Sequence, residues 1–506
     1  MKKFLHSLYS EDYRAQYPEN CSSPKSKERF WWGILLIALI LRVWGAFYSR
    51  GFIYPDELFQ TLEPAHGLVF GNWIKTWEWQ AGIRSWFSPY LVAALIHFFG
   101  FLGLSQPSGM ITALQCTMGI LSLLTVASGY RCGLHLGGPK HARLIALFLG
   151  ISPVFVYYGV HPLSEAIIAN FFILAFLWVV DSLQESLQEN LRESPQVQRA
   201  NLLKASGAGF ILGIAFGIRF QSALFALGLG LIYLTAKKIR LLCVLTLTFL
   251  LVSLLTVGWI DMKTWGSFFS SPIRYFDFNI IQNGATEFFG AAPWHRYITT
   301  LGRFFSLPLG LSILFLTFLS LFRFKSNWMI YVSIGPYLIV HQLISHKEDR
   351  FIFPILPFLV LLAILSWNPI WNQKKILKWS AIALFSACTL FQYFHLNWKW
   401  NGDVTDFYTQ LGKREDLRGL LACGQSVDKT GGYFYLHKKV PFQISSQAKD
   451  CPLQLIPERF NFLIFAGTTA SEKLNLEMKK RNLHCSPVPE LSPMLYRCED
   501  SNPGFL

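Results

Sequence analysis

Carboxylates gather in the polar segment that follows the first long apolar run of the sequence. Within residues 51–86 the acidic side chains, joined by one histidine, are Asp56, Glu57, Glu63, Glu78 and His66. The pair Asp56 and Glu57 follows a proline, so the start of a helix is its ordinary explanation. Ionisable groups beside apolar segments are costly, however, and usually serve a path or a site. The cluster as a whole therefore favours chemistry that needs a general base.

Cations gather in a short turn between two later apolar segments. Residues 345–351 carry His346, Lys347 and Arg350, with Glu348 among them. Snorkelling towards lipid headgroups is the ordinary explanation for the two long basic side chains. A bound phosphate is the other explanation, because lysine and arginine supply charge-assisted hydrogen bonds to phosphate oxygens.

Aromatic and amide side chains are concentrated in residues 261–302. The set, with one histidine, is Trp265, Tyr275, Asn279, Asn283, Trp294 and His295. Aromatic faces stack on sugar rings and amides bond hydroxyl groups, so the segment suits sugar recognition. An aromatic belt at the membrane interface is the ordinary alternative. Weaker candidates for substrate contacts are Trp79 and Arg84 of the first loop and the isolated polar residues His161, Glu165, Arg219 and Gln221.

The composition indicates that the elements which position these residues lie in a membrane. Hydrophobic residues make up 52% of the 506-residue chain, charged residues only 15%, and the mean hydropathy is +0.35. Soluble proteins carry roughly 25% charged residues. Apolar segments of about 20 residues, the length that spans a bilayer as a helix, recur along the chain. They lie near 31–49, 87–104, 109–130, 142–160, 162–180, 207–235, 240–260, 303–322, 327–344, 352–367 and 376–396. The sequence thus predicts an α-helical polytopic membrane protein with roughly ten to twelve transmembrane helices.

Basic residues between the spans predict the orientation of the chain. The segments 237–240, 323–325 and 374–378 each hold two or three lysines or arginines and are expected in the cytoplasm. The loops 51–86, 261–302 and 345–351 then face the opposite side. The turn between Arg131 and Arg143 also looks cytoplasmic, which leaves the number of crossings before it open.

Three regions are expected along the chain. Residues 1–30 form a cytoplasmic N-terminal tail, without a cleavable signal peptide. Residues 31–399 form a transmembrane catalytic domain, and residues 400–506, which are more polar, form a small mixed α/β domain outside the cytoplasm. Short apolar runs such as 461–466 are its expected strands. Its four cysteines suit two disulfides of unspecified pairing in an oxidising compartment: Cys423, Cys451, Cys485 and Cys498.

The net charge and the residues available to bind ligands indicate which partners and cofactors are expected. The net charge of +15 is explained by cytoplasmic lysines and arginines and by contact with membrane lipids. Basic runs with interleaved aromatic residues are missing from the sequence, so no nucleic-acid partner is expected. No cofactor is expected either, although a divalent metal shared by Asp56, Glu57 and Glu78 stays an open alternative.

The polar motifs, in the order in which they occur along the chain, resemble those of glycosyltransferase family twenty-two within the GT-C superfamily. That family contains the mannosyltransferases of GPI-anchor and N-glycan precursor assembly. The motifs that carry the resemblance are Pro55-Asp56-Glu57, Glu63-Pro64-Ala65-His66, Thr76-Trp77-Glu78-Trp79, Phe278-Asn279-Ile280, Pro293-Trp294-His295, His346-Lys347-Glu348 and Arg350-Phe351. The third of them is most similar to the branch that adds the third mannose of a GPI anchor. Two positions depart from the family pattern, Asp261-Met262-Lys263 and Arg296, and both lie where acceptor contacts are expected.

The resemblance implies an inverting mannosyltransferase of GT-C type. Its partners would be a polyprenyl (dolichyl-type) phosphate mannose donor and a lipid-linked glycan acceptor. Asp56 would be the catalytic base, with Glu57 as competitor, and His346, Lys347 and Arg350 would bind the donor phosphate. Further substrate contacts would be Glu78, Trp79, Arg84, Arg219, Gln221, Trp294, His295 and Glu348.

Two other classes of membrane protein are alternatives for this sequence. A transporter or flippase of lipid-linked sugars would place polar groups near the bilayer midplane, often in two related halves. A scaffold protein would not need carboxylates and cations in separate clusters. The expected location is the endoplasmic reticulum membrane in a eukaryote, or the inner membrane with the site facing the periplasm in a bacterium.

Overall fold

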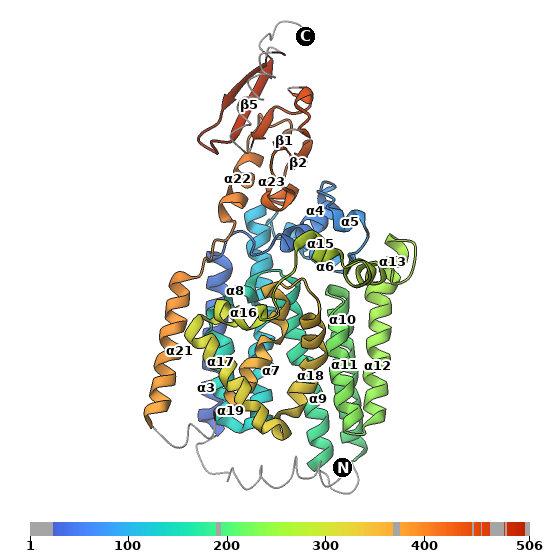
Figure 1. Ribbon diagram of the computed structural model, residues 1–506, viewed down its shortest axis with the longest axis vertical. Helices are drawn as coiled ribbons and strands as arrows, with labels where there is room; N and C mark the ends of the chain where they lie inside the picture. Colours follow the sequence, from blue (N-terminus) through green and yellow to red (C-terminus); the bar gives the residue numbers. More distant parts are fainter. Residues whose placement is uncertain are drawn as a thin grey trace. The chain divides into compact units, whose positions relative to one another are not determined.

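Long apolar helices dominate the structure (Figure 1). The computed structural model describes residues 24–188, 194–367, 375–447, 450–456, 458–465, 480 and 483–500. Among these residues, seven helices are long and apolar enough to cross a membrane. They are Phe30–Tyr48, Pro107–Ile151, Ser164–Leu183, Pro195–Ile218, Ile239–Thr264, Leu307–Leu343 and Asp349–Ser366. The expectation of a helical, multi-pass membrane protein is confirmed.

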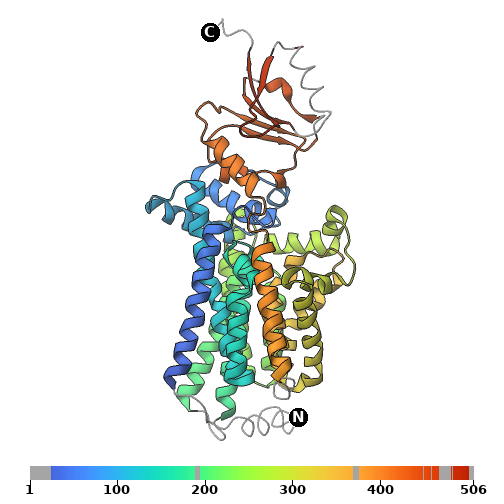
Figure 2. The same cartoon turned by 90° about the vertical axis from the view of Figure 1, so that its left-hand side faces the viewer.

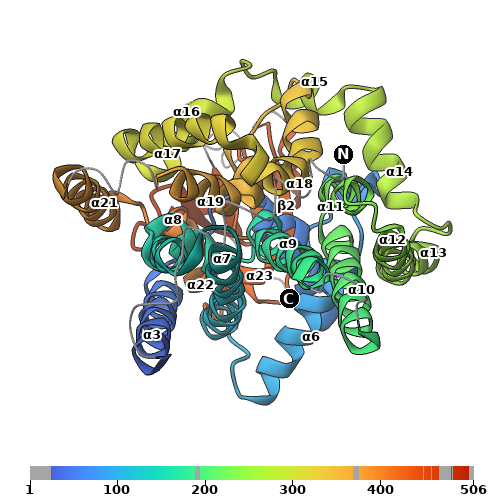
Figure 3. The same ribbon diagram turned by 90° about the horizontal axis from the view of Figure 1, so that it is seen from below.

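The described residues form two compact units, and the first contains most of the long helices. It comprises the chain up to Phe47, Ala81–Ser88 and Gln115–Asn397. Its helices are α3 (Pro24–Tyr48), α7 (Pro107–Ile151), α8 (Pro153–Val160), α9 (Ser164–Gln188), α10 (Pro195–Ile218), α11 (Ser222–Thr235), α12 (Ile239–Ser253), α13 (Trp259–Thr264), α14 (Ser270–Phe276), α15 (Gly284–Phe289), α16 (Arg296–Phe305), α17 (Leu307–Ser320), α18 (Phe324–Leu343), α19 (Leu356–Ser366) and α21 (Lys375–His395). Short π-helical and 3-10 turns are η2 (Leu254–Gly258), η3 (Asp277–Ile281), η4 (Leu321–Arg323) and η5 (Asp349–Ile355). Seen from below in Figure 3, α10 packs against α9 and α12, and α11 packs against α18.

Some of these seven ranges combine more than one of the apolar segments that the sequence predicts. The segment 109–130 and the first part of 142–160 lie on either side of Gly138 in α7, where φ is 80° before Pro139 and two helices meet at a kink. The last part of 142–160 is α8. The range Leu307–Leu343 likewise joins α17 and α18 through a short 3-10 turn. The segment 207–235, by contrast, divides into α10 and α11, which meet at Arg219–Gln221. The predicted tail 1–30 lies outside the described residues up to position 23, as does Lys374.

A buried arginine fastens the first span to its neighbours. Arg42 in α3 is 1% exposed. Its Nε donates to Ser122 Oγ at 2.6 Å, and Nη1 and Nη2 donate to the carbonyls of Gly150 and Leu149 at 2.9 and 3.2 Å. The charged group is therefore supplied with acceptors inside the unit, as a cation within an apolar span must be.

The second unit combines the first loop with the C-terminal residues. It comprises Tyr48–Gln80, Pro89–Leu114 and the chain from Trp398. Its helices are η1 (Glu57–Leu62), α4 (Glu63–Phe70), α5 (Trp77–Gln80), α6 (Phe87–Phe101, mostly in this unit), α22 (Gly402–Gly412), η6 (Val427–Lys429), α23 (Gly432–Leu436) and η8 (Leu453–Leu455).

A small mixed sheet, drawn as red arrows in Figure 2, forms the C-terminal part of this unit. Its described strands are β1 (Leu420–Cys423), β2 (Phe442–Ser445), β3 (Phe462–Phe465), β4 (Leu483–Pro487) and β5 (Leu495–Asp500), in the order β2-β1-β3-β5-β4. β1 pairs in parallel with β2 and β3, and β5 pairs antiparallel with β3 and β4. The central strands β1 and β3 are fully buried, which is why they read as unbroken apolar runs. The expected mixed C-terminal sheet is confirmed.

The four C-terminal cysteines form two disulfides, and the structure supplies the pairing that the sequence left open. Cys423 bonds to Cys451, and Cys485 bonds to Cys498 across the β4–β5 pair. Disulfides persist in oxidising compartments, so this part of the chain suits a non-cytoplasmic face.

Candidate active site

The acidic group of the first loop lies in the second unit, around η1. Asp56 precedes η1 but makes no capping hydrogen bond with its side chain. Instead its Oδ2 accepts from Gln60 Nε2, which also donates to Glu78 Oε1 at 3.2 Å. Asp56, Gln60 and Glu78 therefore form a connected polar group, and Asp56 and Glu78 are each partly exposed. A partly exposed carboxylate held by an amide is suitably placed to take a proton from a substrate.

Glu57 has a different environment from its neighbour. Its side chain is 2% exposed, and Oε1 accepts the backbone N–H groups of Ile53 and Tyr54 at 2.8 and 3.2 Å. These bonds tie the carboxylate to the turn that precedes the helix. Asp56 is thus the better candidate for a base, and Glu57 positions the segment that carries it.

Trp79 and Arg84, the other two candidates of the first loop, belong to different units. Trp79 is fully buried, and its Nε1 donates to the carbonyl of Phe59 at 2.9 Å. This is a packing position, so the expected substrate contact of Trp79 is not supported by its place in the fold. Arg84 belongs to the first unit, where its guanidinium lies 5.6 Å from the ring centre of Tyr275. Gln221 donates to the Tyr275 hydroxyl, so these three side chains form one group.

Five ionisable side chains of the first unit form what we call the arginine cluster: Glu165, Arg219, His346, Glu348 and Arg350. Arg219 Nη1 lies 3.0 Å from Glu165 Oε1. Arg350 Nε lies 3.5 Å from the same oxygen and 2.9 Å from Glu348 Oε2. Arg219, Arg350 and Glu165 are each at most 6% exposed. The cluster brings α9, the α10–α11 junction and the 345–351 turn together.

His346 lies at the edge of this cluster between two hydrogen-bond acceptors. Its Nδ1 lies 3.0 Å from the carbonyl oxygen of Gly290, and its Nε2 lies 3.2 Å from Glu348 Oε1. This arrangement favours the protonated ring. The hydrogen bond to Glu348 accordingly raises the pKa of His346, although burial opposes the rise. Burial also tends to raise the pKa of Glu348, but Arg350 and His346 together lower it to about 2.

The charges around the turn do not balance. Lys347 is 7% exposed, and its Nζ donates to the carbonyl of Ile344 at 2.6 Å. Within the described part of the chain no carboxylate is paired with it. Arg219, Lys347 and Arg350 therefore supply three positive charges against the two negative charges of Glu165 and Glu348, and His346 adds a further basic group. A surplus of buried positive charge favours an anionic ligand.

Asp349 and Arg296 form a second contact at the same turn. Asp349 Oδ1 accepts from Arg296 Nε at 2.8 Å and from Thr300 Oγ1 at 2.7 Å, and Oδ2 lies 2.9 Å from Arg303 Nη1. Arg296, one of the departures from the family pattern, thus fastens α16 to the turn. Trp294 beside it is 72% exposed, and its ring contacts that of His295. The expected sugar contacts of Trp294 and His295 stay predictions.

Glu165 was one of the weaker candidates from the sequence, and in the structure it lies between two arginines. It bridges Arg219 and Arg350, which are 131 positions apart in the sequence. The available signal was that Glu165 is the one carboxylate in the apolar residues 142–180. Its partners lie more than fifty positions away, so spacing alone did not reveal the contact.

The open alternative of a divalent metal would draw on Asp56, Glu57 and Glu78. In the described ranges, no group of three or more histidine, cysteine, aspartate or glutamate side chains is arranged to hold a metal ion. Of the three residues proposed to share one, Glu57 already uses an oxygen to accept two backbone N–H groups.

A buried carboxylate joins the first loop to the C-terminal residues inside the second unit. Glu63 is fully buried and accepts the N–H groups of Ile74 and Tyr433, both at 2.8 Å, and of Phe434 at 2.9 Å. Burial raises the pKa of Glu63 to about 7, against the opposing effect of these donors. We call this contact, with the adjoining His66–His437 pair, the Glu63 junction. It explains Glu63 and His66 as structural residues.

The two histidines of the junction share one hydrogen bond. His66 Nδ1 donates to the carbonyl of Asn72 at 2.8 Å, so its Nε2 is the acceptor for His437 Nδ1, which lies 3.1 Å away. Burial, together with His437, lowers the pKa of His66 to about 4, although the bond to Asn72 opposes the change. Burial also lowers the pKa of His437. The contact therefore requires neutral imidazoles.

Acidification is expected to weaken the Glu63 junction. Because the folded-state pKa of His66 lies below the ordinary 6.5, the unfolded chain binds more protons between these values. Stability is therefore lost as the pH falls from 6.5 towards 4. From pH 7 to pH 5 the free energy of unfolding of the natural protein should fall by roughly 2 kcal/mol more than that of His66→Asn. Thermal unfolding of both proteins in detergent at the two pH values measures this difference.

The control for this measurement is His484→Asn, which removes an exposed histidine of the same unit. It should lose the same stability on acidification as the natural protein does. The Glu63 carboxyl is present in all three proteins, so its contribution cancels. Equal losses in the natural protein and His66→Asn would contradict the prediction.

Proteins similar to this chain are known from several eukaryotes. The chain is 26% identical to GPI mannosyltransferase 3 of Yarrowia lipolytica over 81% of this chain and 76% of that protein. It is 28% identical to GPI mannosyltransferase 3 of Drosophila melanogaster over 64% and 54% of the two chains, and 26% identical to human GPI alpha-1,2-mannosyltransferase 3 over 68% and 58%. The chain thus spans little more than half the length of the latter two relatives.

The fold is similar to that of a solved bacterial enzyme. The crystal structure of ArnT from Cupriavidus metallidurans bound to undecaprenyl phosphate matches with a TM-score of 0.64 at 12% identity, over 92% of this chain and 97% of that chain. This likeness confirms the GT-C type of fold. The family model described as the Alg9-like mannosyltransferase family matches residues 33–418. The chain belongs to this Alg9-like mannosyltransferase family, as its polar motifs had predicted.

Proposed function

We propose that this protein transfers mannose from a polyprenyl (dolichyl-type) phosphate mannose donor to a lipid-linked glycan such as a GPI-anchor precursor. The observation that carries the proposal is the buried surplus of positive charge in the arginine cluster and Lys347. Membership in a mannosyltransferase family supports the reaction, and relatives named GPI mannosyltransferase 3 support the acceptor class.

The reaction is a single displacement at the anomeric carbon. The acceptor hydroxyl loses its proton to an Asp56 oxygen, and the resulting oxygen forms the new bond to the anomeric carbon. The bond from that carbon to the phosphate oxygen breaks at the same time, and its electron pair leaves with the polyprenyl phosphate. The phosphate diester becomes a monoester, so negative charge develops on the leaving group and cations stabilise it.

The proposed roles follow the environments of the residues. Asp56, held by Gln60, is the base. Arg219, His346, Lys347 and Arg350 hold the donor phosphate, while Glu165 and Glu348 orient the two guanidinium groups. Glu78, Arg84, Gln221, Trp294 and His295 are proposed as further substrate contacts. The non-cytoplasmic orientation and the region boundaries given above are part of the same proposal.

Lys347→Ala should weaken use of the donor. The Lys347 ammonium donates to a backbone carbonyl, so its removal leaves no carboxylate unpaired. We expect the KM for the phosphate-linked donor to rise about tenfold, because a charge-assisted bond to phosphate is lost. Transfer from labelled dolichyl phosphate mannose to a lipid-linked acceptor by purified protein measures it. Lys140→Ala, which removes an exposed lysine of the same unit, is the control; an unchanged donor KM in Lys347→Ala would exclude Lys347 from the phosphate site.

The same assay separates the enzyme from a flippase. An enzyme makes a larger lipid-linked glycan from labelled donor in detergent, where no bilayer separates two compartments. A flippase makes no new glycan under these conditions. Absence of the larger product with intact, folded protein and every tested acceptor of the class would overturn the proposed function.

A further inference from the structure

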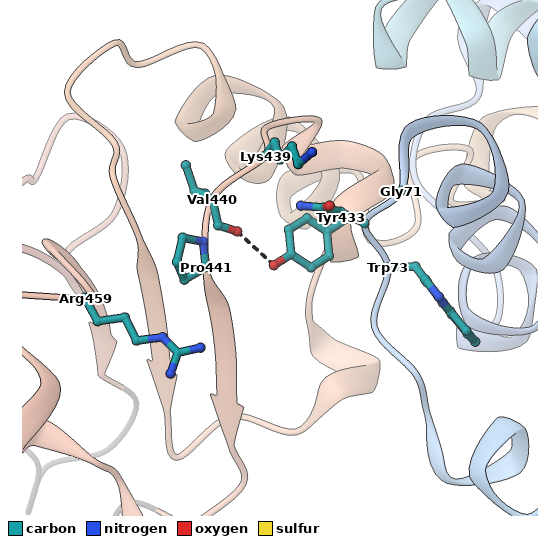
Figure 4. Close-up of a pocket in the computed structure, with 8 residues that line it drawn as sticks. Gly71, Trp73, Tyr433, Lys439, Val440, Pro441 and Arg459 are labelled. Atoms are coloured by element: carbon teal, nitrogen blue, oxygen red, sulfur yellow. Dashed lines mark hydrogen bonds between the residues drawn. The ribbon is translucent and has the colours of Figure 1, made fainter.

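A pocket of about 500 Å³ lies within the second unit. Its lining residues, shown in Figure 4, are Gly71, Asn72, Trp73, Tyr433, Lys439, Val440, Pro441 and Arg459. None of them belongs to the acidic group around Asp56 or to the arginine cluster. Small-molecule sites in proteins occupy roughly 300–1,000 Å³, so the volume suits a ligand of one or two rings.

The charge of the lining is entirely positive. Lys439 and Arg459 are the two ionisable lining residues other than a tyrosine, and no lining residue is an aspartate or glutamate. Both cations are exposed, and in the described part of the second unit neither is paired with a carboxylate. The Arg459 guanidinium lies 5.6 Å from the ring centre of Phe460. Lys439 and Arg459 line one hollow that has no acidic lining residue, which fits an anionic group, phosphate above all.

The neutral part of the lining is held in place. Figure 4 shows Tyr433 between Val440 and the segment that carries Gly71 and Trp73, with its hydroxyl bonded to the Val440 carbonyl at 2.8 Å. The Tyr433 backbone N–H donates to the buried Glu63, so this wall is fixed from behind as well. Asn72 adds an amide that is only partly exposed. An aromatic ring, a proline and an amide on a preformed wall suit a hydroxylated ring.

We propose that this pocket binds a phosphorylated saccharide, with the phosphate on Lys439 and Arg459 and the sugar ring against the wall formed by Tyr433, Pro441 and Asn72. The site adds to the proposed transfer reaction and does not depend on it, because the two share no residue. The cations would bind the phosphate and the wall would bind the sugar ring, so the two parts of the ligand can be tested separately.

Direct binding to the purified full-length protein in detergent tests the proposal. The probes are mannose 6-phosphate, mannose and inorganic phosphate, each titrated by calorimetry. Mannose 6-phosphate should bind at least tenfold more tightly than either fragment. In the double variant Lys439→Ala/Arg459→Ala its dissociation constant should rise at least tenfold. The matched double variant Lys413→Ala/Lys429→Ala, which removes two exposed lysines of the same unit, should bind as the natural protein does.

The alternatives give distinct results. Equal affinity for inorganic phosphate and mannose 6-phosphate would overturn the sugar part of the proposal. Binding of vesicles containing phosphatidylserine that depends on Lys439 and Arg459, without binding of mannose 6-phosphate, would overturn it in favour of a membrane surface. Equal losses in both double variants would show that only net charge matters. The unfolding midpoint of each variant verifies the fold, and since this assay measures binding alone, an inactive transferase that binds the sugar phosphate would refute the proposed function only.

Discussion

Asp56→Asn is expected to lower mannose transfer by roughly 10²–10⁴-fold, the usual contribution of a general base. The asparagine oxygen still accepts the hydrogen bond from Gln60, so the local contact is kept and only the ability to take a proton is lost. The effect should fall on kcat, with little change in the KM for the donor, because the base acts on the acceptor hydroxyl. Labelled-donor transfer with purified protein measures both constants.

Two variants sharpen this prediction. Asp403→Asn makes the same change at an exposed aspartate of the second unit and should keep full activity. Glu57→Gln likewise keeps an oxygen that accepts the bonds from Ile53 and Tyr54, so it should fold and keep most of the transfer activity. If Glu57→Gln folds normally and loses transfer while Asp56→Asn keeps it, the base is Glu57 and our assignment is wrong.

Arg350→Lys is expected to lower transfer by roughly 10²-fold, within the range for loss of one preorganised donor group. Lysine keeps the positive charge, but it cannot bond both oxygens of Glu348 as the guanidinium does through Nε and Nη2. Glu348 then competes with the substrate phosphate for the remaining donors. Both kcat and the donor KM should change, because the cluster acts on the bound donor and on the leaving group.

Arg303→Lys is the matched control, since Arg303 pairs with Asp349 near the same turn but its side chain is 52% exposed. Surface pairs contribute roughly 0–1 kcal/mol, so its activity should change by less than about fivefold. Because Arg350 is buried, the unfolding midpoint must be measured beside activity. A folded Arg350→Lys protein with normal donor KM and kcat would remove the arginine cluster from phosphate binding.

The local features of this protein were readable from its sequence. Hydropathy located the spans, because the bilayer imposes both length and composition on a helix. The break at Arg219–Gln221 was visible as polar residues in an apolar run, and β3 was visible as an apolar run among polar residues. The joins between neighbouring spans were not readable in the same way, since the two helices that meet at the kink in α7, and also α17 and α18, follow one another almost without a loop.

The contacts between distant residues could not be read from the sequence. Glu165 and Arg350 are 185 positions apart, and nothing in their local patterns names one as the partner of the other. Trp79 shows a related limit, because an aromatic side chain that packs inside the protein and one that stacks on a sugar look alike in a sequence. The type of chemistry was thus predicted, while the choice of residues within each motif needed the structure.

The Glu63 junction has a consequence for the synthesis of this chain. Glu63 emerges early, whereas its partner Phe434 follows 371 residues later. At roughly 5–20 residues per second, translation of that interval takes about 20–70 s. During this time the nascent first loop exposes a carboxylate that has no backbone N–H groups from the C-terminal segment to bind. The loop that carries the proposed base therefore completes this contact only after Tyr433 and Phe434 have been made, and a ribosome that stalls before position 430 leaves it unfinished.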